Sequence, residues 1–204
     1  MSPSGLGWIV VDSLGTLMIM NLTSRLENAR EWLSNSLSYD QDQEVNTFET
    51  TIRMLGGLLS AHYLSTHLRD ASSPHDYVYL AQAKDLADRL LGAYDSDSGI
   101  PYSSVNLHTR KGVHSYFDGG ASSMAEAGTL QLEMKYLSNI TKQEIYWRKA
   151  EKIIKVFDDN SMGESLLPIY VDADMGKFMG QEIRLGSRGD SYYGVLPCIP
   201  ISSL

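Results

Sequence analysis

The chain has a single cysteine, Cys198, among its 204 residues. One thiol forms no disulfide within the chain and no cysteine-rich zinc site, so the sequence excludes both. Basic residues are also scarce, because 17 Lys and Arg stand against 25 Asp and Glu for a net charge of −8. An acidic chain without a lysine- or arginine-rich run repels phosphate backbones, so we expect no nucleic-acid partner.

A long hydrophobic run is missing as well. The longest apolar stretch, residues 8–20, is interrupted by Asp12, Ser13, Gly15 and Thr16. A membrane-spanning helix needs about 20 apolar residues, so we expect no membrane segment here. The stretch also lacks a basic flank and a cleavage site of small residues, which a signal peptide would have. An apolar fraction of 43% and a charged fraction of 21% are ordinary for a globular domain.

Apolar residues recur at steps of three and four along most of the chain, which predicts an all-α fold. We expect helices at residues 8–20, 22–37, 44–67, 77–94, 122–137 and 143–157, with a short one starting near residue 191. Asn46 and Thr47 are suitable caps for the third helix. Residues 100–117 predict a β-hairpin or a long loop, and residues 168–171 a short strand before a turn at 174–176.

The expected helices come in pairs, with hairpins inserted between the pairs. This order is typical of α/α toroids and helical solenoids. The helix of each pair that is apolar on most sides should pack on the inside, which fits residues 8–20 and 44–67. Residues 22–37 and 77–94 have one charged face each and fit the outer ring.

Glu49 and Arg53 are the first candidates for chemistry. They are four residues apart on an expected helix and therefore share a face. Gly56, Gly57 and Ser60 continue roughly that face and leave room for a ligand. The same spacing is also typical of a surface ion pair that only stabilises its helix.

Three more carboxylates stand at positions that suit either stability or function. Asp190 precedes the last helix, where it could be a cap or a carboxylate that the helix dipole keeps ionised. Glu126 lies near the start of the helix at 122–137, where a negative charge is favourable by itself. Asp12 lies in the apolar first helix and must be paired or face water. None of these residues identifies a function alone.

Together the candidates belong to four sequence blocks that resemble those of glycoside hydrolase family 47, the class I α-1,2-mannosidases. The blocks follow the order of the family, and the match is most similar to fungal members of the endoplasmic reticulum and Golgi type. They are Gly7-Trp-Ile-Val-Val-Asp-Ser-Leu14, Asn46-Thr-Phe-Glu-Thr-Thr-Ile-Arg53, Ala125-Glu-Ala-Gly128 with Gln131-Leu-Glu133, and Arg188-Gly-Asp-Ser-Tyr-Tyr193.

The resemblance implies an (αα)₇ barrel that hydrolyses α-1,2-linked mannose of high-mannose N-glycans with inversion, in the lumen of the secretory pathway. By motif, Glu49 matches the family's general acid, and Asp190 matches one of its two candidates for activating water. Arg53, Glu126 and Arg188 match residues that line the sugar-binding cleft. The family also needs Ca²⁺, whose ligating residue we expect to be absent from this chain.

Two departures from the family pattern stand out. Gly15 replaces a second Asp of the first block, which removes a carboxylate from the expected barrel lumen. After Tyr193 the chain diverges, because Pro197 and Pro200 forbid the helix that the family has there. We therefore assign residues 1–193 to the N-terminal part of a mannosidase catalytic domain and 194–204 to a divergent tail. The chain alone is expected to be poorly stable and weakly active or inactive.

Two other hypotheses stay open. The chain could be a non-catalytic protein of the same fold that binds high-mannose glycans, or an unrelated helical-repeat interaction module. Two sequons, Asn21-Leu-Thr23 and Asn139-Ile-Thr141, are consistent with a protein of the secretory pathway. The sequence leaves open the oligomeric state and the mannose branch that is cleaved.

Overall fold

The computed structural model describes residues 5–160 and 166–195, and this part of the chain is mainly helical. The π-helix η1 covers Thr50–Leu55, and short 3₁₀ turns are η2 (Arg69–Ala71), η3 (Leu91–Tyr94) and η4 (Asp118–Gly120). The α-helices are α1 (Trp8–Ile19), α2 (Thr23–Asn35), α3 (Thr47–Glu49), α4 (Gly56–His67), α5 (Tyr77–Leu90), α6 (Met124–Gly128), α7 (Gln131–Thr141), α8 (Glu144–Asn160) and α9 (Asp190–Val195).

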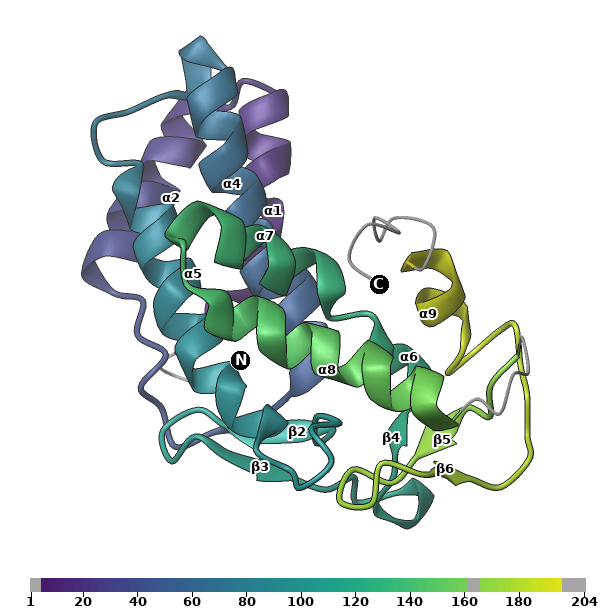
Figure 1. Ribbon diagram of the computed structural model, residues 1–204. Coiled ribbons are helices and arrows are strands. Elements are labelled where there is room, and N and C mark those ends of the chain that lie inside the picture. The colour runs from purple at the N-terminus through teal and green to yellow at the C-terminus, as the bar shows by residue number, and fades with distance from the viewer. Residues whose placement is uncertain (1–4, 161–165, 196–204) are drawn as a thin grey trace.

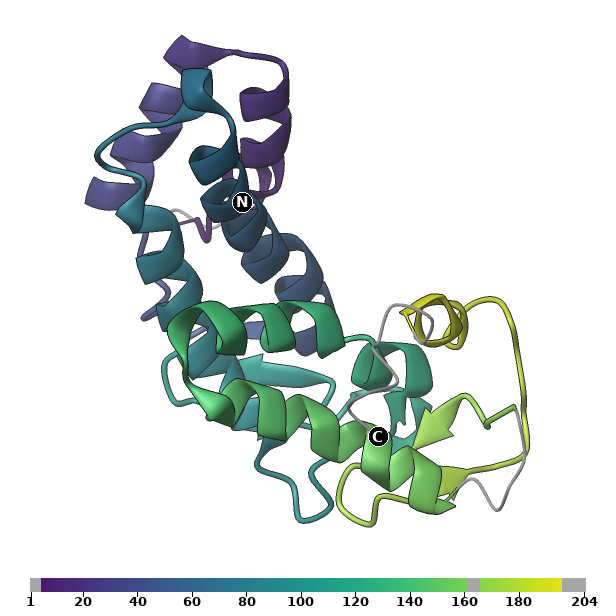
Figure 2. The ribbon, with the colours of Figure 1, turned by 45° about the horizontal axis from the view of Figure 1, so that its top comes forward.

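The helices pack in two rows, as the pairing pattern predicts. In the inner row α1 packs on α4, α4 packs on α7, and α6 packs on α9. In the outer row α2 packs on α5, and the two rows meet in the pairs α1–α2, α4–α5 and α7–α8. Figure 2 shows these pairs following a curved path from the purple N-terminal helices to the yellow α9. The inner positions expected for residues 8–20 and 44–67 agree with this packing.

Two small antiparallel sheets lie at the same end of the molecule, the lower end in Figure 1. In the first, β2 (Ser104–Asn106) is the central strand between β1 (Glu44–Asn46) and β3 (Lys111–Val113), with Val45 opposite Val105. In the second, β5 (Tyr170–Val171) lies between β4 (Ser122–Ser123) and β6 (Phe178–Met179). The hairpin expected within residues 100–117 is therefore present, and the strand and turn expected near 168–176 are present too.

The expected helix at 44–67 is correct only from Thr47 onward, because residues 44–46 form a strand. Asn46 caps the helix as expected, since its side chain accepts a hydrogen bond from the Glu49 N–H at 2.7 Å. The backbone then passes through the π-helix η1, which the sequence did not predict. A π turn adds one residue to the helical repeat and shifts which side chains face inward. Ile52 is half-buried and Tyr63 is exposed, although steps of three and four residues align both with the buried Leu55 and Leu59.

The expected helix at 122–137 was also wrong as one continuous element. Residues 122–123 form β4, and the helical part divides into α6 and α7 around Thr129 and Leu130. The Thr129 hydroxyl donates a hydrogen bond to the Ala125 carbonyl at 2.5 Å within this region. Leu130, which the apolar pattern placed in the middle of one helix, lies between α6 and α7. Its side chain is nevertheless fully buried in the core.

Close approach between α1 and α4 holds the first part of the inner row together. A Cβ on Gly57 would lie 2.8 Å from the Val11 carbonyl oxygen, so only glycine fits there. Val11, Leu14 and Leu58 are fully buried beside this contact.

No helix among residues 5–160 and 166–195 has the length and apolar character needed to cross a membrane. Cys198 and both tail prolines lie outside the described residues.

Candidate active site

Glu49 and Arg53 lie on one face of the helix, as their spacing predicts. The Arg53 Nε donates to the Glu49 carboxylate at 2.5 Å, and the other arm of the guanidinium lies 3.7 Å from the Asp12 carboxylate on α1. The side chains of Glu49, Arg53 and Asp12 are 43%, 51% and 51% exposed, so a ligand can reach this cluster. Asp12 is thus both paired and in contact with water, which avoids the free-energy cost of burying an unpaired charge.

Glu126 connects the start of α3 to the start of α6. Its carboxylate accepts hydrogen bonds from the Ser123 hydroxyl at 2.8 Å and from the Asn46 amide at 3.2 Å. Ser123 and Glu126 form a capping box, in which each side chain binds the backbone N–H of the other residue. Glu126 therefore stabilises the start of α6, as its position in the sequence predicts. Its contact with Asn46 also joins the starts of α3 and α6.

Arg188 is held by a second group of side chains next to α6. Its guanidinium lies 2.7 Å from the Asp118 carboxylate and 5.2 Å from the centre of the Tyr170 ring. Tyr170 donates its hydroxyl to the same carboxylate at 3.0 Å. The Arg188 carbonyl accepts from the Ala125 N–H at 2.9 Å, which places this loop against the first turn of α6.

Asp190 is the first residue of α9 and is exposed. Its carboxylate accepts from the Ser191 N–H at 2.8 Å, so the side chain stays near the end of its own helix. Behind it, a Cβ on Gly189 would lie 2.3 Å from the Arg184 carbonyl oxygen, which leaves room there only for glycine. Asp190 is therefore held close to its own backbone by the bond from Ser191 and is exposed to solvent.

Three of the predicted carboxylates thus share one structural position. Glu49, Glu126 and Asp190 each lie in the first turn of a helix, and α6 packs between α3 and α9. The bonds from Asn46 to Glu126 and from Ala125 to Arg188 place the starts of these helices side by side. The positive end of each helix dipole favours a negative charge at that position. The arrangement is a row of fixed carboxylates at one end of the inner helices.

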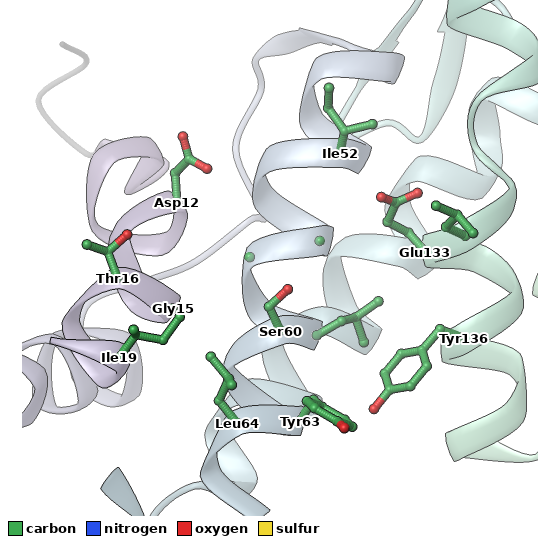
Figure 3. Close-up of a pocket in the computed structure, with 14 residues that line it drawn as sticks. Asp12, Gly15, Thr16, Ile19, Ile52, Ser60, Tyr63, Leu64, Glu133 and Tyr136 are labelled. Carbon is green, nitrogen blue, oxygen red and sulfur yellow. The ribbon is translucent and has the colours of Figure 1, made fainter. Parts of the chain in front are cut away.

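A groove of about 670 Å³ runs along the inner row beyond this end. Figure 3 shows Asp12 and Thr16 of α1 on one side, Ser60 and Tyr63 of α4 in the middle, and α7 on the other side. Gly15 lies in the groove wall, and a Cβ there would meet only Leu64 at 3.7 Å. The groove reaches Asp12 but is lined by neither Glu49 nor Asp190. This groove therefore does not bring together the two carboxylates that the family resemblance implies to be catalytic.

Glu133 on α7 is a groove residue that the sequence reasoning did not select. One carboxylate oxygen is buried without a hydrogen-bond partner, and burial raises the pKa of Glu133 to about 7. Its spacing carried a signal, because Leu130 and Leu137 lie three and four residues away on the same helical face. A carboxylate at an apolar helix position requires a partner or a function. Asp118, the partner of Arg188, was also missed and had no comparable signal.

No group of three or more His, Cys, Asp or Glu side chains that could hold a metal ion is present within residues 5–160 and 166–195. The Glu49 and Asp12 carboxylates both lie near the Arg53 guanidinium, at 2.5 and 3.7 Å. The calcium requirement that the family resemblance implies is therefore not assigned to these residues.

Similarity to known proteins excludes one of the hypotheses that the sequence left open. The sequence profile of Glycosyl hydrolase family 47 matches residues 1–199. The chain belongs to this family. An unrelated helical-repeat module is thereby excluded. The family 47 chain is 56% identical over 196 residues to the mannosyl-oligosaccharide 1,2-alpha-mannosidase of Candida albicans, covering 96% of the chain and 33% of that protein.

The chain is also similar to an enzyme of a second yeast and to a solved structure. The endoplasmic reticulum mannosyl-oligosaccharide 1,2-alpha-mannosidase of Saccharomyces cerevisiae is 46% identical, with 94% of this chain and 37% of that protein covered. An alpha-1,2-mannosidase structure from Trichoderma reesei matches with a TM-score of 0.84 and 25% identity over 96% of this chain and 42% of that one. The predicted α/α barrel architecture is confirmed, and the chain spans about a third of the length of its curated relatives.

Proposed function

We propose that this chain is part of an inverting α-1,2-mannosidase that trims high-mannose N-glycans in the lumen of the endoplasmic reticulum. Relatives from Schizosaccharomyces pombe and Saccharomyces cerevisiae are named as endoplasmic reticulum enzymes with this activity. The observation that carries the proposal is the row of first-turn carboxylates, Glu49, Glu126 and Asp190, at the starts of neighbouring inner helices. A requirement for calcium is part of the proposal, and its ligands are not assigned to this chain.

In the proposed reaction, the bond between C1 of the terminal mannose and the glycosidic oxygen breaks. Glu49 acts as the general acid and gives a proton to the leaving oxygen, and Asp190 acts as the base and takes a proton from the water that attacks C1 from the opposite face. Inverting enzymes place these two carboxyl groups about 6.5–9.5 Å apart to leave room for that water. Arg53 positions the Glu49 carboxyl group, which it contacts directly. Glu126 and Arg188 bind sugar hydroxyl groups by charge-assisted hydrogen bonds.

A chimera tests the proposal despite the partial coverage of the relatives. Residues 5–195 of this chain would replace the aligned segment of the Saccharomyces cerevisiae mannosidase, and release of mannose from Man₉GlcNAc₂ would be measured with calcium present. We expect Glu49→Gln to lower turnover by at least ~100-fold, the usual effect of losing a general acid. Glu144→Gln is the matched control, because Glu144 and Arg148 form a similarly spaced ion pair on α8 that is mostly exposed. Equal turnover in the Glu49→Gln and Glu144→Gln chimeras would contradict the assignment.

Binding of high-mannose glycans without hydrolysis is the second candidate, and Gly15 favours it. The groove wall lacks the carboxylate of the family pattern at this position, while the space around it can accept a side chain. We expect Gly15→Asp to increase turnover of the chimera if the missing carboxylate limits catalysis. Calorimetric glycan binding with no turnover in both the parent and the Gly15→Asp chimera would support the binding protein instead.

A further inference from the structure

The turn between α1 and α2 contains a complete N-glycosylation sequon on an exposed surface. Asn21, Leu22 and Thr23 are all exposed. Asn21 has a left-handed backbone with φ of 53°, and its N–H donates to the Met18 carbonyl at 3.1 Å. This backbone bond closes the turn between the two helices. Asn-X-Thr in such a surface turn is the acceptor motif for N-linked glycans.

We propose that Asn21 is N-glycosylated. The Asn21 amide nitrogen would attack the anomeric carbon of a lipid-diphosphate-linked oligosaccharide. A nitrogen–carbon bond forms, the bond between that carbon and the diphosphate oxygen breaks, and the amide loses one proton as the lipid diphosphate leaves. The proposal rests on the proposed function only for the compartment, since the donor lipid is available in the lumen of the endoplasmic reticulum.

The second sequon offers an internal comparison, because it lies inside a helix. Asn139 is in the last part of α7, and the Thr141 hydroxyl donates to the Leu137 carbonyl at 2.7 Å. That hydroxyl is half-buried, and the Asn139 amide oxygen lies 3.4 Å from the Lys142 ammonium group. A transferase that must bind both the Asn and the Thr side chain would have to unwind this turn of α7. The Asn21 sequon needs no such opening.

The position of Asn21 is compatible with an active enzyme. Asp12, which lies near Arg53, is in the N-terminal half of α1, and Asn21 follows the C-terminal end of the same helix. At 1.5 Å per residue, the seven steps from Asp12 to Ile19, the last residue of α1, span roughly 10 Å, and Asn21 lies beyond that end. The attachment point on Asn21 therefore lies past the end of α1 that is farther from Arg53. Ile19 and Met20 next to the turn are 71% and 62% exposed, and a hydrophilic glycan would shield this apolar tip from association.

Peptide mass spectrometry tests the proposal. The 204-residue chain would be produced in yeast behind a cleavable secretion leader, and only leader-cleaved chains, which have reached the lumen, would be analysed. Peptide N-glycosidase treatment in ¹⁸O water marks each formerly glycosylated Asn as a heavy Asp. We expect the mark on Asn21 in the parent chain and its loss in Thr23→Ala, whereas Thr23→Ser retains it. An unmarked Asn21 in leader-cleaved chains, with or without a mark on Asn139, overturns the proposal.

The readout is independent of the proposed hydrolase activity, because the leader supplies the compartment and the mass shift needs no turnover. Glu49→Gln should therefore carry the same mark on Asn21 as the parent chain. Asn139→Gln is the matched control for an unrelated sequon change, and it should leave the Asn21 mark intact. Loss of the Asn21 mark in Asn139→Gln would contradict the assignment of an independent site.

Discussion

The buried carboxyl group of Glu133 makes the stability of this protein depend on pH in a defined direction. Burial raises its pKa to about 7 from the ordinary 4.5, against a smaller opposing contribution from its own backbone N–H near the start of α7. Between pH 4.5 and 7 the folded protein keeps a proton on Glu133 that the unfolded chain has already released. Stability should therefore fall as pH rises through this range and level off above it.

The magnitude follows from the difference between the two pKa values. A pKa of about 7 in the folded state against 4.5 in the unfolded chain corresponds to about 3 kcal/mol of destabilisation when Glu133 is ionised. Glu133→Gln keeps the shape of the side chain and cannot ionise. We expect this variant to match the wild type near pH 4.5 and to exceed its unfolding free energy by up to about 3 kcal/mol at pH 8.

Urea unfolding followed by far-ultraviolet circular dichroism, at several pH values between 4 and 8, measures this difference. All other titrating groups are shared by the two proteins, so the difference between their curves isolates Glu133. Glu144→Gln, which removes an exposed carboxylate, should run parallel to the wild type. Carbon-13 chemical shifts of the glutamate carboxyl groups give the Glu133 pKa directly. Parallel stability curves for Glu133→Gln and the wild type, or titration of Glu133 near 4.5, would refute the reasoning.

Three further changes have expected effects on unfolding free energy, each measured by urea denaturation. Gly57→Ala should cost about 1–3 kcal/mol, because its Cβ meets the Val11 carbonyl oxygen at 2.8 Å. Gly56→Ala is the control and should cost less, since its Cβ would make only ordinary contacts from 3.5 Å outward. Ser123→Ala removes the cap of α6 and should cost about 1 kcal/mol. Arg30→Met leaves the Asp76 carboxylate without its buried partner at 2.8 Å and should cost about 3–5 kcal/mol. Losses below about 0.5 kcal/mol would contradict these contacts.

Local patterns predicted the elements whose structure depends on near neighbours. The helices at 8–20 and 22–37 agree with α1 and α2 because the apolar spacing of each segment matches one buried helical face. The Asn46 cap and the Glu49–Arg53 pair also follow from spacings of three and four residues. The roles of these residues came from the family resemblance and not from their spacing, which a surface ion pair would share.

Where the local patterns gave a wrong prediction, contacts between segments distant in the sequence determined the structure. Residues 44–46 have a local pattern compatible with a helix, but pairing with residues 104–106 makes them a strand. Asp118 reaches Arg188 only because the second sheet places η4 beside the loop before α9.

By itself, the sequence determined the helix pairs, the order of the inner and outer rows, and the residues that could carry charge near an active site. Each of these depends on spacing along the chain, which the order of amino acids contains directly. The tertiary structure alone decided the burial that raises the pKa of Glu133 and the alignment of three helix starts that carry carboxylates. The free energy of a charge depends on which side chains and how much water surround it, and only the folded chain sets those surroundings.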